Sequence, residues 1–366
     1  MCLGNLTISF NTAAVAAAIP LISQDLHKAD FLVSRIVAFY MIPYGLGALL
    51  YAPLTRLITY RSILIVAILA YAVFSLISGL SHSLNYILMA QVGAGIAAAS
   101  STPLSLMIIG ELFDKDIRGR LVGGYFGASF FASMMGMISL GLINWHWLFL
   151  IPAFLGILTA LGFMLLKTDL LDCVHKFSIN YFKAFARADI RNVFIFIFIM
   201  SALYHGVHKW YGMYLFHEYH LNTQTISLFL IVAAVCGLSG QQIGGYLSDK
   251  KGRLVACYVG ISILGVGTML LLGHYLYWVL PVILGIISIG WTINHNSVST
   301  ILTDFPDQDR PIIASLNSAV RFVSGGIGFS LSSFFVQKSF SLTFLGIGIL
   351  FLIMSLTIKR VMPDHA

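Results

Sequence analysis

Charged residues are scarce in this sequence. They make up 10% of its 366 residues, whereas hydrophobic residues make up 58%, and the mean hydropathy is +0.91. A soluble domain is about a quarter charged and about half apolar, while each membrane-spanning helix needs roughly 20 mainly apolar residues. The composition therefore excludes a cytosolic enzyme, a nucleic-acid-binding protein and a secreted disulfide-rich scaffold. It predicts an all-α integral membrane protein.

Cysteine is also rare, and its spacing indicates neither disulfide pairing nor a metal site. The four cysteines are scattered along the chain as Cys2, Cys173, Cys236 and Cys257, so we expect free thiols, no bound metal and no cofactor. A net charge of +7 would favour nucleic acid as a partner of a soluble protein. In a membrane protein a positive net charge reflects the lysine and arginine residues in the loops, which set the orientation of the chain in the membrane.

Hydropathy windows of about 20 residues predict twelve spans. They cover residues 2–22, 34–56, 62–80, 84–110, 120–143, 147–167, 192–216, 223–247, 254–274, 276–303, 310–336 and 340–359. The first apolar run lacks a preceding basic segment, so we interpret it as a span and not as a cleaved signal. The longest connection is central. We therefore predict a six-helix bundle over 1–167, a cytoplasmic linker over 168–191 and a second, pseudo-symmetric six-helix bundle over 192–366.

Lysine and arginine alternate between the predicted loops. Loops after even-numbered spans, together with the C-terminus, hold 16 of them, and loops after odd-numbered spans hold three. Cytoplasmic loops carry the excess of positive residues in membrane proteins. The count predicts a multi-pass protein of the inner (cytoplasmic) cell membrane with both termini in the cytoplasm.

The two halves of the sequence echo each other at an offset near 192 residues. Arg118 after the fourth span corresponds to Arg310 after the tenth, and Arg61 after the second corresponds to Arg253 after the eighth. Weak internal symmetry of this kind is typical of a duplicated six-helix unit.

The connection between the eighth and ninth predicted spans carries a specific motif, GYLSDKKGR, over residues 245–253. Glycine permits a tight turn, and the carboxylate is favoured at a neighbouring helix N-terminus. The motif resembles the G-x-L-x-D-x-x-G-R signature of the major facilitator superfamily. The resemblance implies a conformational latch, to which we assign Gly245, Asp249, Gly252, Arg253, Arg118 and Arg310.

Three further stretches resemble the same family, so the resemblance covers nearly the whole chain. They are AAVAAAIP at 13–20, QVGAGIAAASSTP at 91–103, and the W-H-W of 145–147 with Phe149, which is similar to a W-R-W-x-F pattern. The resemblance implies a twelve-span transporter of the drug- or metabolite-exporting type. The sequence departs from the family pattern at Arg56 or Leu57, where the first-half latch expects an acid. It also has Gln91 in place of arginine and lacks proline in the fifth span.

Ionisable residues inside the predicted spans are basic or histidine. No span carries a carboxylate at mid-depth, but His205, His208 and Lys209 share one helix face. Arg321 lies 11 residues from the start of its span, or roughly 16 Å deep at 1.5 Å per residue. Together with Asn294 and His295, these residues predict an electropositive cavity that favours an anionic group.

Each of these residues also has a structural interpretation. The histidines can be packing residues, Lys209 can extend along its span to the interface, and Arg321 can serve a structural hydrogen-bond network. Trp210 and Tyr211 fit either an interfacial belt or a ligand contact. In the first half, four residues fit either helix–helix contacts or a substrate-facing wall: Asn11, Tyr40, Tyr44 and Gln91.

The sequence thus predicts secondary active transport of a small organic molecule by two bundles that rock around a midplane site. The family resemblance favours efflux of drug-like or metabolite compounds. Since no span carries a buried acid, histidine (His205, His208 or His295) is the candidate proton carrier, because its unperturbed pKa lies near physiological pH. The residues themselves favour a uniporter or symporter for an organic anion, such as a carboxylate, a siderophore-like chelate or a lipid-like anion. A transport-inactive sensor or scaffold is a third hypothesis, and a membrane enzyme lacks the paired catalytic groups it needs. We expect a monomer in the lipid bilayer, with a small-molecule substrate and protons as partners and no nucleic acid.

Overall fold

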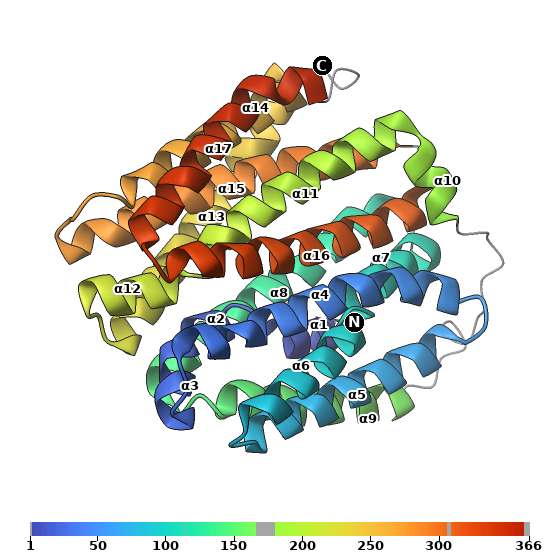
Figure 1. Ribbon diagram of the computed structural model, residues 1–366. Helices are drawn as coiled ribbons and strands as arrows, with labels where there is room; N and C mark the ends of the chain where they lie inside the picture. Colours follow the sequence, from blue (N-terminus) through green and yellow to red (C-terminus); the bar gives the residue numbers. More distant parts are fainter. Residues whose placement is uncertain (1, 114, 166–179, 306–308, 362–366) are drawn as a thin grey trace. The chain divides into compact units, whose positions relative to one another are not determined.

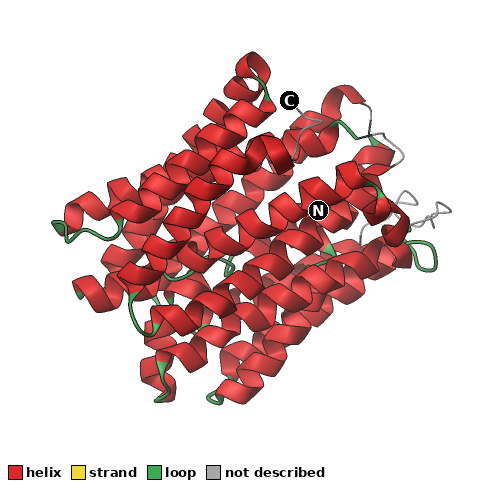
Figure 2. Ribbon diagram, turned by 45° about the horizontal axis from the view of Figure 1, so that its top comes forward, coloured by secondary structure: helices red, strands yellow, loops and turns green. Residues whose placement is uncertain are grey.

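The computed structural model describes residues 2–113, 115–165, 180–305 and 309–361. Within these ranges every regular element is a helix (Figure 2). In the described part of the chain, 11 helices are long and apolar enough to cross a membrane, or 12 if one bent pair counts as a single span. The predicted all-α membrane fold is confirmed.

Contacts divide the chain into two compact units. The first comprises Met1–Tyr181 and Pro311–Gly326, and the second comprises Phe182–Arg310 and Ile327–Ala366. Helix α16 (Arg310–Val336) therefore contributes its first half to one unit and its second half to the other.

Helices of the first unit pack in a connected group. Helix α5 (Tyr60–Leu80) packs against α6 (Leu84–Ala98) and α9 (Trp147–Leu165), and α4 (Asp30–Leu54) packs against α6 (Figure 1). Tyr60, Leu104 and Phe163 belong to one buried apolar cluster of this unit. Its helices are α1 (Cys2–Ser9), α2 (Ala14–Ala17), α3 (Ile19–Leu26), α4 (Asp30–Leu54), α5 (Tyr60–Leu80), α6 (Leu84–Ala98), α7 (Ser101–Leu112), α8 (Lys115–Leu142) and α9 (Trp147–Leu165).

In the second unit, helix α15 packs against both α13 and α14, and α17 packs against α14 and α11 (Figure 1). The side chain of Asn222 caps α13 by accepting a hydrogen bond from the Thr225 amide at 2.9 Å, which fixes where that helix begins. The helices that follow the first unit are α10 (Tyr181–Ala186), α11 (Ala188–His208), α12 (Tyr211–Tyr219), α13 (Thr223–Lys251), α14 (Arg253–Leu270), η2 (Tyr277–Val279), α15 (Leu280–Thr303) and α17 (Phe340–Val361).

Helix boundaries repeat along the chain. Helices α4, α5 and α9 begin 193 residues before α13, α14 and α17, respectively. His27 and His220, which are also 193 residues apart, both end a helix in the left-handed conformation, with φ of 50° and 51°. The helix starts agree with the internal offset near 192 residues seen in the sequence.

The first span is bent. Segment Leu3–Ala17 bends by 72° from Ile19–Leu26, so the prediction of one continuous helix over 2–22 was wrong in this respect. In the second half, a two-residue turn at Lys209 and Trp210 separates α11 from α12, but Ala188–Tyr219 still counts as one candidate membrane span, in agreement with the span predicted over 192–216. Hydropathy follows depth in the membrane and carries no information about a change of helix direction.

Tyrosine hydroxyls attach α12 to the end of α14. Tyr214 donates to the Leu271 carbonyl at 2.9 Å, and Tyr219 donates to the Gly273 carbonyl at 3.1 Å. Helix α12, the outer part of the span Ala188–Tyr219, is therefore held against the end of α14.

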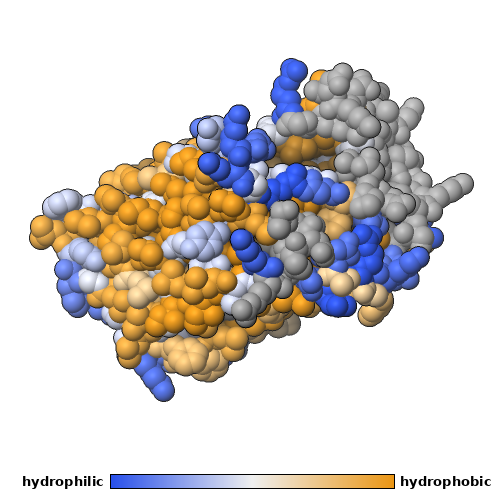
Figure 3. Space-filling view, turned by 90° about the horizontal axis from the view of Figure 1, so that it is seen from above, coloured by the Kyte–Doolittle hydropathy of each residue, from blue (hydrophilic) through white to orange (hydrophobic). Residues whose placement is uncertain are grey.

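Large apolar side chains remain exposed along the helices. Leu142, Leu165 and Leu356 are each more than three-quarters exposed, and apolar side chains cover much of the face in Figure 3. Surfaces of this kind suit a hydrocarbon environment, in which each spanning helix satisfies its own backbone hydrogen bonds.

Candidate functional site

Aromatic and imidazole rings form a cluster in the second unit. Tyr204 of α11 stacks on Trp291 of α15 with ring centroids 3.7 Å apart and planes within 4°, and His208 stacks near Tyr204 at 4.9 Å. His205 meets the edges of Tyr204 at 5.2 Å and of Trp291 at 6.0 Å. Helical spacing accounts for the arrangement, because Tyr204 and His208 lie one turn apart on the same face. We call these rings, with Tyr211 and His295, the ring cluster.

The remaining two rings extend this cluster at its ends. Tyr211 of α12 meets His208 edge-on at 5.3 Å, and His295 lies one turn after Trp291 on α15, at 5.6 Å from it. The structure therefore brings together the three histidines that the sequence predicted as site residues, although His295 comes from another helix.

Two buried polar atoms of the ring cluster have no hydrogen-bond partner among the described residues. They are Nδ1 of His208 and the hydroxyl of Tyr211. An unsatisfied buried polar group costs about 1–3 kcal/mol. A bound molecule with a hydrogen-bonding group next to a planar apolar part would satisfy both atoms and stack on the rings.

The break that follows α11 is buried. Lys209 is 6% exposed and Trp210 is 1% exposed. The Trp210 indole donates to Ser332 Oγ at 2.8 Å and stacks on Phe329 at 4.5 Å. The burial of Trp210 contradicts its interpretation as an interfacial belt residue, and its N–H and its ring are used in packing; the ligand contact stays a prediction. The predicted extension of the Lys209 side chain to the membrane interface is also wrong, because this side chain is buried.

In the first unit, Arg321 lies in α16 with a partner on its own helix. Its Nε donates to Asn317 Oδ1 at 2.7 Å, one turn away. Next to it, Phe322 stacks on Tyr44 of α4 at 3.8 Å, and Tyr44 lies 5.9 Å from Tyr40. The structure thus groups Arg321 with an aromatic wall that the sequence placed in the other half.

Asn11 and Gln91 hold neighbouring helices together. The Tyr71 hydroxyl of α5 donates to Asn11 Oδ1 at 3.3 Å, and Gln91 Nε2 of α6 donates to Ser78 Oγ of α5 at 2.9 Å. These contacts agree with the interpretation of both residues as links between neighbouring segments, and their contact with substrate stays a prediction.

Asn294 is 3% exposed and lies where α15 approaches α14. A Cβ on Gly260 would meet the Asn294 backbone nitrogen at 2.7 Å. Its neighbour along the helix, His295, belongs to the ring cluster. The two adjacent residues therefore face different surroundings.

The latch residues of the second unit lie around the turn from α13 to α14. Gly252 has φ of 93°, a conformation that favours glycine. Arg253 forms an ion pair with Asp304 at the end of α15, and Asp249 is exposed in the last turn of α13. Gly245 sits where an added Cβ would meet Asn296 Nδ2 at 3.3 Å. The side chains of the two remaining members, Arg118 and Arg310, lie outside the described part of the chain.

A second ionic group precedes α11. Arg187 contacts Asp189 at 2.7 Å and Asp309 at 2.6 Å. The hydrogen bonds with Asp189 and then with Asp309 raise the pKa of the Arg187 guanidinium. The group joins the start of α11 to the residue just before α16.

Sequence reasoning missed three residues that build these sites. Tyr204 and Trp291 form the tightest stack of the ring cluster, and Asn317 binds Arg321. Helical spacing could have indicated two of them, since Asn317 lies four residues before Arg321 and Trp291 lies four residues before His295. The thiols of Cys236 and Cys257 are free, as expected, whereas Cys173 and the side chain of Cys2 lie outside the described part.

The model of the family described as Major Facilitator Superfamily matches residues 1–329 and 213–365. The chain belongs to the Major Facilitator Superfamily. Its helices suited to spanning a membrane are those of a multi-pass transporter family.

Relatives within the Major Facilitator Superfamily are distant. Multidrug resistance protein 3 of Bacillus subtilis (strain 168) is 27% identical over 162 residues, which cover 43% of this chain and 31% of that protein. A probable L-galactonate transporter of Escherichia coli (strain K12) is 22% identical over 253 residues, which cover 62% of this chain and 55% of that protein. The chain thus spans between about a third and about a half of the length of these two relatives.

A solved structure of a D-xylose–proton symporter has the same fold. It superposes with a TM-score of 0.79 at 16% identity, covering 100% of this chain and 97% of that one. At this identity the likeness shows the fold alone.

Proposed function

We propose that this transporter exports small organic molecules in exchange for protons by alternating access. The observation that carries the proposal is the ring cluster of the second unit. Stacking between Tyr204 and Trp291 at 3.7 Å provides a flat apolar surface. The partnerless atoms of His208 and Tyr211 provide polar anchors beside it. A planar or aromatic substrate with one hydrogen-bonding group matches both.

Histidine supports the coupling to protons. Every Asp and Glu in the described helices lies near a helix end or in a short helix beside a connection, so no carboxylate is placed at mid-span to titrate. Imidazole changes its charge near physiological pH. We assign the proton exchange to His205 and His208, with substrate contacts to Tyr204, Tyr211 and Trp291.

The proposed direction of transport rests on sequence similarity, and the proposed membrane topology rests on the distribution of charged residues. Relatives include a multidrug resistance protein, which supports export. The excess of lysine and arginine after even-numbered spans supports a cytoplasmic-membrane protein with both termini in the cytoplasm. We further infer that it works as a monomer and that Gly245, Asp249, Gly252 and Arg253 latch one of its conformations.

The test measures proton movement in inside-out vesicles that contain the protein. A pH-gradient dye reports recovery when a pool of aromatic organic cations or a pool of organic anions is added. We expect recovery in the wild type. Trp291→Leu removes one stacking partner worth about 0.5–1.5 kcal/mol, so it should weaken the apparent affinity about 2- to 10-fold.

A histidine comparison separates coupling from binding. His208→Gln should abolish gradient-driven accumulation while preserving exchange of labelled substrate. His220→Asn is the matched control, because His220 is exposed and asparagine tolerates its left-handed backbone. Gradient-driven transport that survives in a His205→Gln/His208→Gln double variant would disprove the histidine mechanism.

A second candidate function is transport of an organic anion. Two cations lie within the predicted spans, Lys209 at 6% exposure in the turn between α11 and α12 and Arg321 beside Asn317 in α16, and intramembrane charges of one sign favour an anion. The similarity to a probable L-galactonate transporter, named for a carboxylate, supports this reading. Recovery with the anion pool alone, abolished by Arg321→Gln, would establish it. No labelled flux with either pool would favour a transport-inactive sensor.

A further inference from the structure

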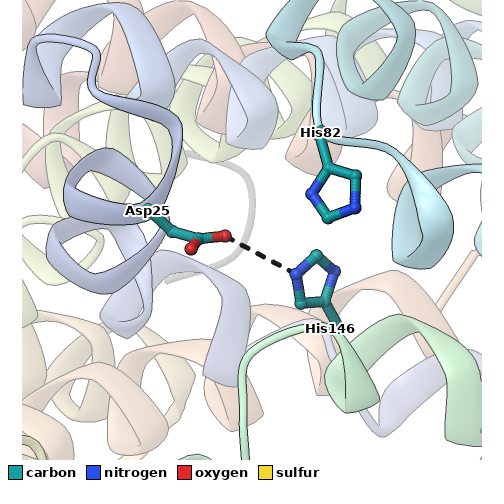
Figure 4. A group of neighbouring side chains, drawn as sticks. All are labelled: Asp25, His82 and His146. Atoms are coloured by element: carbon teal, nitrogen blue, oxygen red, sulfur yellow. Dashed lines mark ion pairs between the residues drawn. The ribbon is translucent and has the colours of Figure 1, made fainter.

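Three connections in the first unit bring a carboxylate and two imidazoles together. Asp25 lies in the last turn of α3, His82 in the connection from α5 to α6, and His146 in the connection from α8 to α9 (Figure 4). One ligand atom of each side chain lies within 4.8 Å of the other two. None of the three belongs to the proposed transport site.

The topology accounts for this convergence. The three connections follow the first, third and fifth predicted spans. Because each span reverses the direction of the chain, connections after odd-numbered spans share one face of the membrane. The lysine and arginine count predicts that this face is outside the cytoplasm.

The spacing of two of these groups matches that of metal ligands. His146 Nε2 lies 3.5 Å from Asp25 Oδ2. Zinc binds imidazole nitrogen at about 2.0–2.1 Å and carboxylate oxygen at about 2.0–2.2 Å in tetrahedral geometry, which separates two ligand atoms by about 3.3–3.5 Å. His82 is exposed and has to approach by at most about 1.5 Å to become the third ligand.

Hydrogen bonds to backbone and indole orient the two closest ligands. His146 Nδ1 lies 2.8 Å from the Gly79 carbonyl. A carbonyl only accepts, so Nδ1 carries the hydrogen. The Trp145 indole donates to Asp25 Oδ2 at 3.1 Å, and its ring stacks on His146 at 3.8 Å. Metal-binding histidines are typically held in this way by a second hydrogen bond to a carbonyl.

The three side chains face one another. With its hydrogen on Nδ1, a neutral His146 presents its Nε2 lone pair to the side where Asp25 Oδ2 lies at 3.5 Å. The His82 ring lies 5.4 Å from the His146 ring. One divalent cation satisfies the lone pairs of both rings and the carboxylate.

We propose that Asp25, His82 and His146 bind a divalent transition-metal ion, with Zn²⁺ as the preferred ion. Two nitrogens and one carboxylate oxygen leave a fourth tetrahedral position for water. The exposure of the side chains supports an open site, since Asp25 is 48% exposed and His146 is 18% exposed. The bound ion ties the end of α3 to two other connections.

The second half of the chain uses different chemistry at the same place. The residues 193 positions later are Glu218, Tyr275 and Ser339, which do not repeat the ligand set. There, Tyr219 joins α12 to the carbonyl of Gly273. In the second unit a tyrosine hydrogen bond thus joins two neighbouring connections. In the first unit the proposed metal site joins the corresponding connections.

The test titrates Zn²⁺ into the purified, metal-stripped full-length protein in detergent and follows binding by calorimetry. Co²⁺ absorption serves as a second readout of tetrahedral coordination. We expect one ion per chain and a higher unfolding temperature with the ion bound. His82→Asn and Asp25→Asn should each weaken binding at least about 10-fold, since even an outer partner of a ligand contributes 10- to 100-fold.

Two further variants serve as controls for Zn²⁺ binding. His27→Asn is the matched control and should leave the affinity unchanged, because His27 is exposed near the cluster and its φ of 50° suits asparagine. His146→Arg keeps a cation opposite Asp25, so it should fold normally on gel filtration and fail to bind Zn²⁺. Absence of wild-type binding, or equal affinity in wild type, His82→Asn and Asp25→Asn, would overturn the proposal. An equal loss in His27→Asn would overturn it as well.

Discussion

The close approach of α4 and α6 makes a sharp prediction for Gly95. A Cβ at this position would collide with the backbone carbonyl of Tyr40 and lie 3.1 Å from the backbone nitrogen of Tyr44. Backbone atoms cannot rotate away as a side chain does. Gly95→Ala therefore forces the two helices apart and displaces the segment that carries both tyrosines.

The expected cost follows from overpacking, which destabilises by about 1–3 kcal/mol. For domains of 150–250 residues, each kcal/mol lowers the midpoint of thermal unfolding by about 2–4 °C. At Gly93 an added Cβ would meet the side chain of Phe74 instead, so Gly93→Ala should cost less, because that ring can shift. Gly162 has nothing within 4 Å of an added Cβ, and its replacement by alanine should be neutral or stabilise the helix by up to about 1 kcal/mol.

The assay heats the three purified variants and the wild type in detergent, and then measures the surviving monodisperse fraction by gel filtration. The expected order of midpoints is Gly162→Ala at or above the wild type, followed by Gly93→Ala and then Gly95→Ala. A Gly95→Ala variant as stable as Gly162→Ala would refute the close helix contact.

Three smaller effects should be measurable by the same unfolding assay. Trp210→Phe keeps the stacked ring but removes the bond to Ser332, which should cost about 0.5–1.5 kcal/mol. Gln91→Leu removes the bond to Ser78 and should cost a similar amount of about 0.5–1.5 kcal/mol. Arg187→Ala should change stability by only about 0.2–1 kcal/mol, because that side chain is 40% exposed. Its effect should diminish further at high salt.

Double variants provide the control for the two hydrogen bonds. Ser332→Ala is combined with Trp210→Phe, and Ser78→Ala with Gln91→Leu. If the loss of stability in a double variant equals the sum of the losses in the two single variants, the pair does not interact and the assignment fails. For Arg187, an unfolding cost that stays constant from low to high salt would contradict an ionic contribution.

Sequence alone predicted most of the helical framework. The long apolar runs of α4, α5, α9 and α17 lie within a few residues of the predicted spans, because hydropathy decides which segments enter lipid. The bend at Ala18 was not predictable in this way. It changes helix direction without changing the apolar character of the segment.

The candidate sites were predictable only where the chemistry was local. His205 and His208 share a helix face by their spacing, which a sequence reveals. The stack of Tyr204 on Trp291 joins residues from helices α11 and α15, and no periodicity relates them. The metal-site residues come from three separate connections, so a search for ligand spacing along the chain could not detect them.

The break between α11 and α12 has a mechanical consequence. Helix α11 packs on α17 and α15, whereas the hydroxyls of Tyr214 and Tyr219 fasten α12 to the end of α14. A displacement of α14 would therefore reach the span Ala188–Tyr219 at its outer end, through Tyr214 and Tyr219. The inner part of the same span has its own contact, because Tyr204 stacks on Trp291 of α15.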